Sequence, residues 1–237
     1  MSRIALAIVG DYDDTFGPHR KTDEAVRHAA DALALDADAR WIPTAELDGG
    51  AERRLAGCDG VWISPGSPYR SMTGALAAIR VCRLGRIPLL ATCGGCQHVI
   101  IEYARAVLGY EDAQHAENDP YASTLFVTPL SCSLVGKTMA VTLDPGSAMA
   151  GLYGRTEVEE QYYCNFGLNP LYEGTVHDGG LRIVGRDADG EARVFVLPAH
   201  PFFVATLFVP SLTSSRARPH PLIVAFLRAA ADRRVSR

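Results

Sequence analysis

Two cysteines in the segment LLATCGGCQHVI, residues 89–100, have a spacing that could support chemistry. Cys93 and Cys96 are three positions apart and enclose Gly94 and Gly95, where an apolar run gives way to a helical pattern. A thiolate there could act as a nucleophile, as one half of a redox pair, or as a metal ligand. An ordinary tight turn around a buried cysteine is the plain alternative. The spacing alone favours that turn as much as it favours a nucleophile.

The neighbours of Cys93 are those that a nucleophile on a sharp turn requires. IPLLATC, 87–93, is predicted as a strand and CQHVIIEYARAVLG, 96–109, as a helix. Ligands of open α/β sheets bind beyond the carboxyl ends of the strands, which is where this turn places Cys93. Gly94 and Gly95 leave room for a strained backbone and for a substrate. The helix directs N–H groups and its positive end at Cys93, which favours a thiolate and an oxyanion.

The rest of the chain supplies the elements that must hold this turn. Strands are predicted at 3–9, in ARWIPTAEL and at 58–66, and helices in TDEAVRHAADALALD, capped by Thr22 or Asp23, and in MTGALAAIRVCRLG. This alternation predicts a mostly parallel sheet with helices on both faces. The second half adds predicted strands, some antiparallel, in TLFVTPL, KTMAVTL, LRIVGRD, ARVFVLP and FFVATLFVP, and a closing helix in PHPLIVAFLRAAADRR. We expect residues 1–237 to form one α/β domain.

Composition and charge argue against several classes of function. The 237 residues are 48% hydrophobic and 21% charged, with a net charge of −4, which is ordinary for a globular protein. A basic block occurs only at the C-terminal end, so we expect no nucleic-acid partner. The early apolar run at 4–9 is too short to span a membrane, and no cleavage site follows it. We therefore expect a cytoplasmic protein without a membrane partner, whose six cysteines are mostly free thiols.

The ordered motifs resemble the class I glutamine amidotransferase family, most closely the glutaminase domain of CTP synthase. IVGDYDDTFGPHRKTDEAVRHA is similar to the opening strand, loop and helix of that domain, and CDGVWISPGSPYRSMTGALAAIR to its oxyanion segment. IPLLATCGGCQHVIIEYARAVLGYEDAQHAENDP resembles its nucleophile strand, helix and following loop. The resemblance covers nearly the whole chain and implies the three-layer, flavodoxin-like amidotransferase fold. It also implies a stand-alone homologue without the synthetase domain, which alone should not make CTP.

The resemblance transfers to some site residues. Cys93 matches the catalytic nucleophile, and Gly66 matches the second glycine of the oxyanion pair, whereas Pro65 replaces the first. Gln97 and Glu117 match positions that hold the polar ends of glutamine, with Glu117 on its ammonium group. Gly94 stands at a leucine position beside the nucleophile, and Cys96 at a methionine position.

Two departures from the family are chemically important. The catalytic His-Pro-Glu should follow FFVATLF, but the sequence there is Val209-Pro210-Ser211. His200-Pro201-Phe202 looks similar but matches a segment before that strand, a strand's length from Cys93. VEEQYYCNFGLN, 158–169, replaces the arginine-rich segment that binds the substrate carboxylate, and Asn165 falls at the position of the arginine. Without a base, efficient glutaminase activity is not expected.

Three functions remain open from the sequence. The favoured hypothesis is a thiol-dependent hydrolase or transferase acting on a small molecule other than free glutamine. The second is a redox protein that uses Cys93 and Cys96, and the third is a catalytically silent module that binds a partner synthase or another copy of the chain. Side chains that could replace the base or join a redox pair are Cys96, Glu160, Tyr163 and Cys164. We predict no cofactor and no metal, because a single C-x-x-C with His98 and His115 is a weak zinc pattern.

Overall fold

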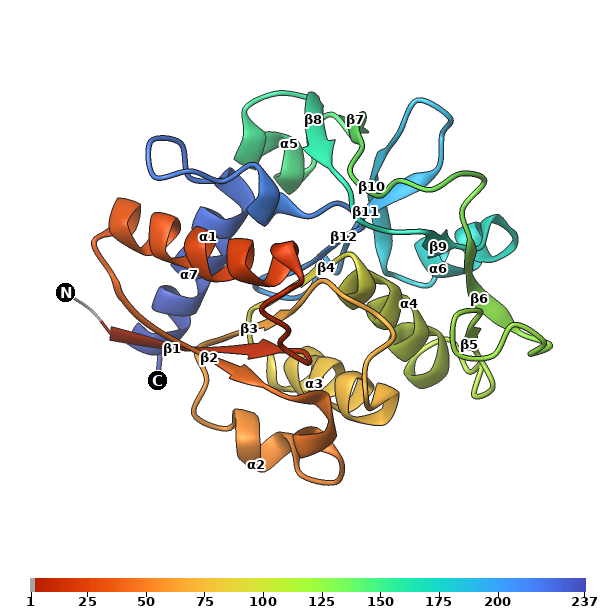
Figure 1. The fold of residues 1–237 in the computed structure, drawn as a ribbon, viewed down its shortest axis with the longest axis horizontal. Helices are drawn as coiled ribbons and strands as arrows, with labels where there is room; N and C mark the ends of the chain where they lie inside the picture. The colour runs from red at the N-terminus through yellow and green to blue at the C-terminus, as the bar shows by residue number, and fades with distance from the viewer. Residues whose placement is uncertain (1–2) are drawn as a thin grey trace.

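Residues 3–237, which the computed structural model of the chain describes, build a nine-stranded mixed sheet with helices on both faces (Figure 1). Five neighbouring strands are parallel, in the order β2 (Asp36–Ile42), β1 (Arg3–Val9), β3 (Gly60–Ile63), β4 (Leu89–Thr92) and β12 (Phe203–Thr206). The sheet continues antiparallel through β11 (Ala192–Val196), β10 (Arg182–Arg186), β7 (Thr138–Leu143) and β8 (Glu157–Gln161). The predicted α/β architecture, a parallel core with an antiparallel portion, is confirmed.

The helices form two layers around this sheet. One face carries α1 (Gly17–Leu33), α7 (Pro221–Val235) and the short α5 (Ala148–Tyr153). The other face carries α3 (Met72–Gly85), α4 (Gly94–Ala106) and the short α2 (Ala51–Leu55). Each face has its own apolar core. The central strands β3 and β4 are therefore buried along their whole length, as expected for strands covered on both sides.

A second, three-stranded sheet lies beside α4. It consists of β5 (Gln114–His115), β6 (Leu125–Pro129) and β9 (Phe166–Leu168), and α6 (Glu173–Asp178) follows it. Single 3₁₀ turns occur at Thr44–Leu47, Pro170–Tyr172 and Pro210–Leu212. The loop that enters β9 contains Tyr163 and Cys164, so this small sheet fixes one wall of the site.

Three predicted boundaries are wrong, each for a local reason. Helix α1 begins at Gly17 rather than beside Thr22, because Pro18 is well suited to a first helical turn. Helix α4 begins at Gly94, directly after Cys93, so the turn is tighter than predicted. Strand β12 ends at Thr206 and not at residue 210, because the chain then crosses to β8, where the Val209 N–H donates to the Gln161 carbonyl at 2.8 Å.

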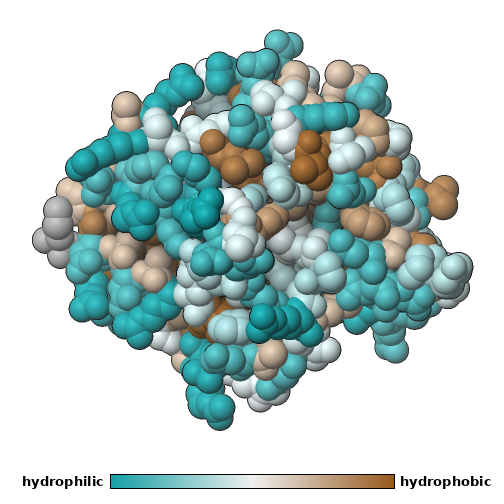
Figure 2. Space-filling view, viewed as in Figure 1, coloured by the Kyte–Doolittle hydropathy of each residue, from teal (hydrophilic) through white to brown (hydrophobic). Residues whose placement is uncertain are grey.

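The surface shows no single large apolar area on the face of Figure 2, where hydrophilic residues prevail and hydrophobic ones are scattered among them. No helix between residues 3 and 237 is both long enough and apolar enough to cross a membrane.

Candidate functional site

The elbow at Cys93 is strained and very closely packed. Cys93 directly follows β4 and has φ 55° and ψ −115°, a conformation that few residues with a side chain adopt. A Cβ on Gly94 would lie 2.5 Å from the carbonyl oxygen of Gly66, and one on Gly95 would collide with that of Ile63. Both glycines are therefore required for α4 to start this close to β3. Strain of this kind is typical of a nucleophile elbow.

A pocket of about 310 Å³ opens at the carboxyl end of β4, next to this elbow. Its wall comes from the β1–α1 loop, the segment after β3, the start of α4, and the loop between β8 and β9. The lining residues are Asp11, Asp13, Phe16, His19, Pro65, Gly66, Ser67, Pro68, Tyr69, Cys93, Gln97, Glu117, Val135, Tyr163, Cys164, Asn165 and Phe166. The pocket thus brings together the predicted residues Cys93, Gly66, Gln97, Glu117, Tyr163 and Cys164.

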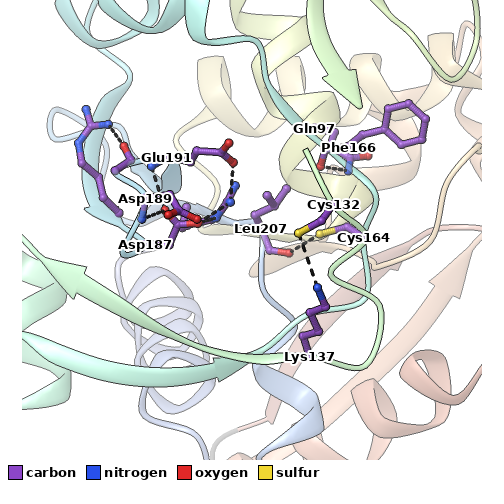
Figure 3. Close-up of polar contacts among 12 residues, drawn as sticks. Gln97, Cys132, Lys137, Cys164, Phe166, Asp187, Asp189, Glu191 and Leu207 are labelled. Carbon is purple, nitrogen blue, oxygen red and sulfur yellow. Dashed lines mark hydrogen bonds and ion pairs between the residues drawn. The ribbon is translucent and has the colours of Figure 1, made fainter. Parts of the chain in front are cut away.

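Two buried thiols meet in this pocket. The Cys93 thiol donates to the Tyr163 carbonyl at 3.3 Å, and the thiol of the next residue, Cys164, donates to the Leu207 carbonyl at 3.4 Å (Figure 3). The pKa of Cys93 is lowered, first because Cys164 donates a hydrogen bond to its sulfur and then through the N–H groups of Gly66 and Gly94, which together outweigh burial. The pKa of Cys164 is correspondingly raised well above its ordinary value, by that same bond and by burial. Cys93 is therefore the thiol that ionises.

Gln97 and Glu117 differ in how far their side chains are engaged. The Gln97 amide donates to the Phe166 carbonyl at 2.9 Å and lies 3.0 Å from Nε2 of His115 (Figure 3). Glu117 is half-buried, and its Oε2 has no hydrogen-bond partner. Burial raises the pKa of Glu117, and a hydrogen bond from Ser67 partly opposes this. Gln97 therefore stiffens the wall, whereas Glu117 has an oxygen available for a ligand.

The histidines near the elbow have structural bonds. His19 accepts from the Asp13 N–H at 2.9 Å through Nδ1, and its Nε2 lies 2.9 Å from the Pro65 carbonyl. The Nδ1 of His98 lies 2.8 Å from the Gly94 carbonyl, and burial lowers the pKa of this histidine to about 4. Burial likewise lowers the pKa of His115 to about 3. Sequence reasoning missed that His19 lines the pocket, and the signal it overlooked was the position of His19 one turn into a helix that follows β1.

The remaining predicted residues lie outside the pocket. Cys96 is fully buried in the core of the α3 and α4 face, and burial raises its pKa well above the ordinary value. Glu160, on β8, accepts from the Tyr153 hydroxyl at 2.6 Å and pairs with His220 at 2.9 Å. Val209 is fully buried in the same apolar cluster as Cys93 and Cys164, and the Ser211 hydroxyl has no partner. His200 precedes β12 and contacts the Cys82 carbonyl, at the opposite end of the sheet.

The arrangement of acidic, thiol and imidazole groups does not suggest a metal centre. Within residues 3–237, no three His, Cys, Asp or Glu side chains are grouped so that they could hold an ion. None of the six cysteines forms a disulfide, and Cys132 is exposed, with Nζ of Lys137 3.6 Å from its sulfur (Figure 3). The chemistry of the pocket therefore rests on Cys93, Cys164 and Glu117.

Known proteins with the same architecture support this location of the site. The family profile "Glutamine amidotransferase class-I" matches residues 21–229. CTP synthases of Bifidobacterium longum and Saccharopolyspora erythraea are 33% and 36% identical, over 99% of this chain but only 46% and 44% of their own length. The glutaminase domain of Trypanosoma brucei CTP synthase, solved with bound acivicin, superposes with a TM-score of 0.90 at 26% identity over 97% of this chain and 94% of that one.

The chain spans under half the length of the CTP synthases that it matches. Its similarity is to their amidotransferase part, and the superposition confirms the predicted amidotransferase fold with its mixed sheet. A subunit-like GMP synthase protein of Thermoplasma acidophilum, 16% identical with a TM-score of 0.62, shares the fold. The chain therefore belongs to the class I glutamine amidotransferase family.

Proposed function

We propose that the chain is a thiol–disulfide oxidoreductase in which Cys93 attacks a small disulfide and Cys164 completes the exchange. The observation that carries this proposal is the pair of hydrogen-bonded thiols in the pocket, with the pKa of Cys93 lowered and that of Cys164 raised. Such a pair contains a reactive thiolate and a second thiol held in reserve. Val209 and Ser211, at the positions of the family's base and carboxylate, supply no group that would activate water.

The reaction balances with the groups in the pocket. The Cys93 thiolate attacks one sulfur of R–S–S–R′, that S–S bond breaks, and R′S⁻ leaves and takes up a proton. The Cys93 sulfur is then a mixed disulfide and no longer negative, so its charge no longer raises the pKa of Cys164. Cys164 loses its proton and attacks the Cys93 sulfur, and RS⁻ leaves. The substrate is reduced by two electrons, the protein holds a Cys93–Cys164 disulfide, and an external dithiol restores both thiols.

Cys164 is better placed than Cys96 for the second step. Cys96 projects into the core on the α3 and α4 side, whereas Cys93 and Cys164 both belong to the opposite cluster and line the pocket. The sequence-based pairing of Cys93 with Cys96 stays a prediction that the same experiment tests.

A second candidate is the thiol-dependent hydrolase or transferase favoured by the sequence. The N–H groups of Gly66 and Gly94 lie close enough to Cys93 to lower its pKa, and in an acyl reaction they would stabilise an oxyanion. However, hydrolysis of an acyl-enzyme needs a base for the attacking water. Among the described lining residues the only imidazole is that of His19, and both of its nitrogens are engaged. Exchange between thiols needs no such base, which favours the redox reaction.

The test is turnover of bis(2-hydroxyethyl) disulfide by the purified chain with a dithiol reductant, together with peptide mass spectrometry. We expect Cys93→Ser to abolish turnover, and Cys164→Ser to accumulate a mixed disulfide on Cys93. Cys96→Ser is the matched control and should turn over at the wild-type rate. Loss of turnover in Cys96→Ser with full activity in Cys164→Ser would assign the second step to Cys96. If Cys93→Ala changes no activity on disulfides or acyl substrates, the silent binding module is the better description.

A further inference from the structure

The charged groups that line the Cys93 pocket are all acidic. Asp11, Asp13 and Glu117 contribute three carboxylates, and within residues 3–237 no lysine or arginine lines the cavity. His19 adds no charge, because its Nδ1 accepts a hydrogen bond and its Nε2 lies against the Pro65 carbonyl, the pattern of a neutral imidazole. When Cys93 ionises, the pocket gains a fourth negative group.

The three carboxylates differ in their availability. Asp11 accepts from Thr44 and from the Arg70 N–H through its oxygens, and Asp13 accepts from Thr15. Both therefore hold loops in place while still contributing negative charge. Glu117 alone has a buried oxygen, Oε2, without any partner. A buried carboxylate oxygen without a partner is costly, and a cationic ligand that donates to it removes the cost.

The side walls also suit a cation. Phe16 and Tyr163 meet edge to face with ring centroids 5.1 Å apart, and Phe166 lies on the same lining. Aromatic faces attract ammonium groups. The neighbouring Asn165 is exposed and uncharged, so a carboxylate on a ligand has no opposite charge there.

The arginines nearest the pocket do not offset this acidity. Arg193 is 3% exposed and is paired with Asp187 and Glu191, each at 2.6 Å. Arg70 lines an adjoining shallow groove, together with Asp11, Asp13 and Asp14. Both arginines are thus matched or outnumbered by carboxylates.

We infer that the Cys93 pocket selects small, positively charged, amine-bearing sulfur electrophiles and disfavours those that carry a carboxylate or another anion. The inference rests on the proposed function, because it names the class of disulfide that Cys93 would attack. The contacts that carry it are the free Glu117 oxygen, the acidic lining and the neutral Asn165.

The test compares two methanethiosulfonates of equal length, one with a 2-aminoethyl group and one with a 2-sulfonatoethyl group. Cys93 attacks the thiol sulfur of either reagent, an S–S bond forms, and methanesulfinate leaves with the electron pair. Cys164→Ser is used so that the mixed disulfide persists, and rates are normalised to those of N-acetylcysteine. We expect a normalised preference for the cation on the order of tenfold at Cys93, from Coulomb attraction in a partly buried site. Exposed Cys132, beside Lys137, is the internal comparison and should show no such preference.

Two variants sharpen the outcome. Glu117→Gln should lose most of the preference, and Asn165→Arg should shift it toward the anionic reagent, whereas Asp178→Asn, on α6 away from the pocket lining, should change nothing. Equal normalised rates, or faster labelling by the anion, would overturn the inference while leaving Cys93 a reactive thiol. If instead Cys93 labels with both reagents no faster than Cys58, the proposed function itself fails.

Discussion

At the scale of single residues, Cys93 depends on one neighbour more than on its helix. Cys164 is the main cause of the lowered pKa of Cys93, ahead of the N–H groups of Gly66 and Gly94. Burial of Cys93 acts in the opposite direction. The donor ability of residue 164 is thus the feature that sets the pH at which the nucleophile forms.

This dependence predicts a pH effect with a matched pair of variants. Lowering the pKa of Cys93 means that its thiolate forms at lower pH than in an ordinary cysteine. Cys164→Ala removes the donor, so the pH midpoint of Cys93 alkylation should move upward. Cys164→Ser keeps an O–H donor and should stay close to the wild type. The rate of iodoacetamide labelling of Cys93 from pH 5 to 10 measures this. Coincident profiles for the alanine and serine variants would show that the hydrogen bond does not set the pKa.

At the scale of elements, the elbow was predictable but its partner was not. The apolar run before Cys93, the two glycines and the helical pattern after them are local signals, and the structure has the strand and helix there. Strand β8 escaped prediction because EVEEQ is mostly polar, with only Val158 and Glu160 buried. The contact of Cys93 with Tyr163 and Cys164 depends on how the loop after β8 crosses the sheet edge, which no local pattern encodes.

The close approach of α4 to β3 gives a prediction about Gly94. Gly94→Ala places a methyl group 2.5 Å from the Gly66 carbonyl, and backbone on both sides has little freedom to move. We expect a loss of about 1–3 kcal/mol in the free energy of unfolding, as for other overpacked sites, and slower labelling of Cys93. Urea denaturation and thiol labelling measure the two effects. Gly151→Ala, in α5 with no atom within 4 Å of the added methyl, is the control and should gain about 0.5–1 kcal/mol.

A wild-type unfolding midpoint in Gly94→Ala, with labelling unchanged, would contradict the close packing described for the elbow.

At the scale of the whole molecule, the antiparallel half of the sheet supports a site that lies at the edge of the parallel half. Arg193, on β11, is buried against Asp187 and Glu191, and its guanidinium lies 6.0 Å from the centre of the Tyr162 ring. Arg193 also lowers the pKa of Cys164, against the larger effects of Cys93 and burial. The expected partners, a synthase or a second copy of this chain, stay a prediction.

This buried ion pair gives the last prediction. Arg193→Met leaves the buried Asp187 without its cation, so we expect a loss of about 3–5 kcal/mol in the free energy of unfolding. The double variant Arg193→Met with Asp187→Asn removes both charges and should recover part of that loss. The same substitution withdraws a positive charge from behind Cys164, so the second step of disulfide exchange should slow relative to the first, and the mixed disulfide on Cys93 should persist for longer. Urea denaturation and rapid-quench mass spectrometry separate the two effects. An Arg193→Met protein as stable as the wild type, with an unchanged mixed-disulfide lifetime, would show that the antiparallel half does not act on the site through this charge.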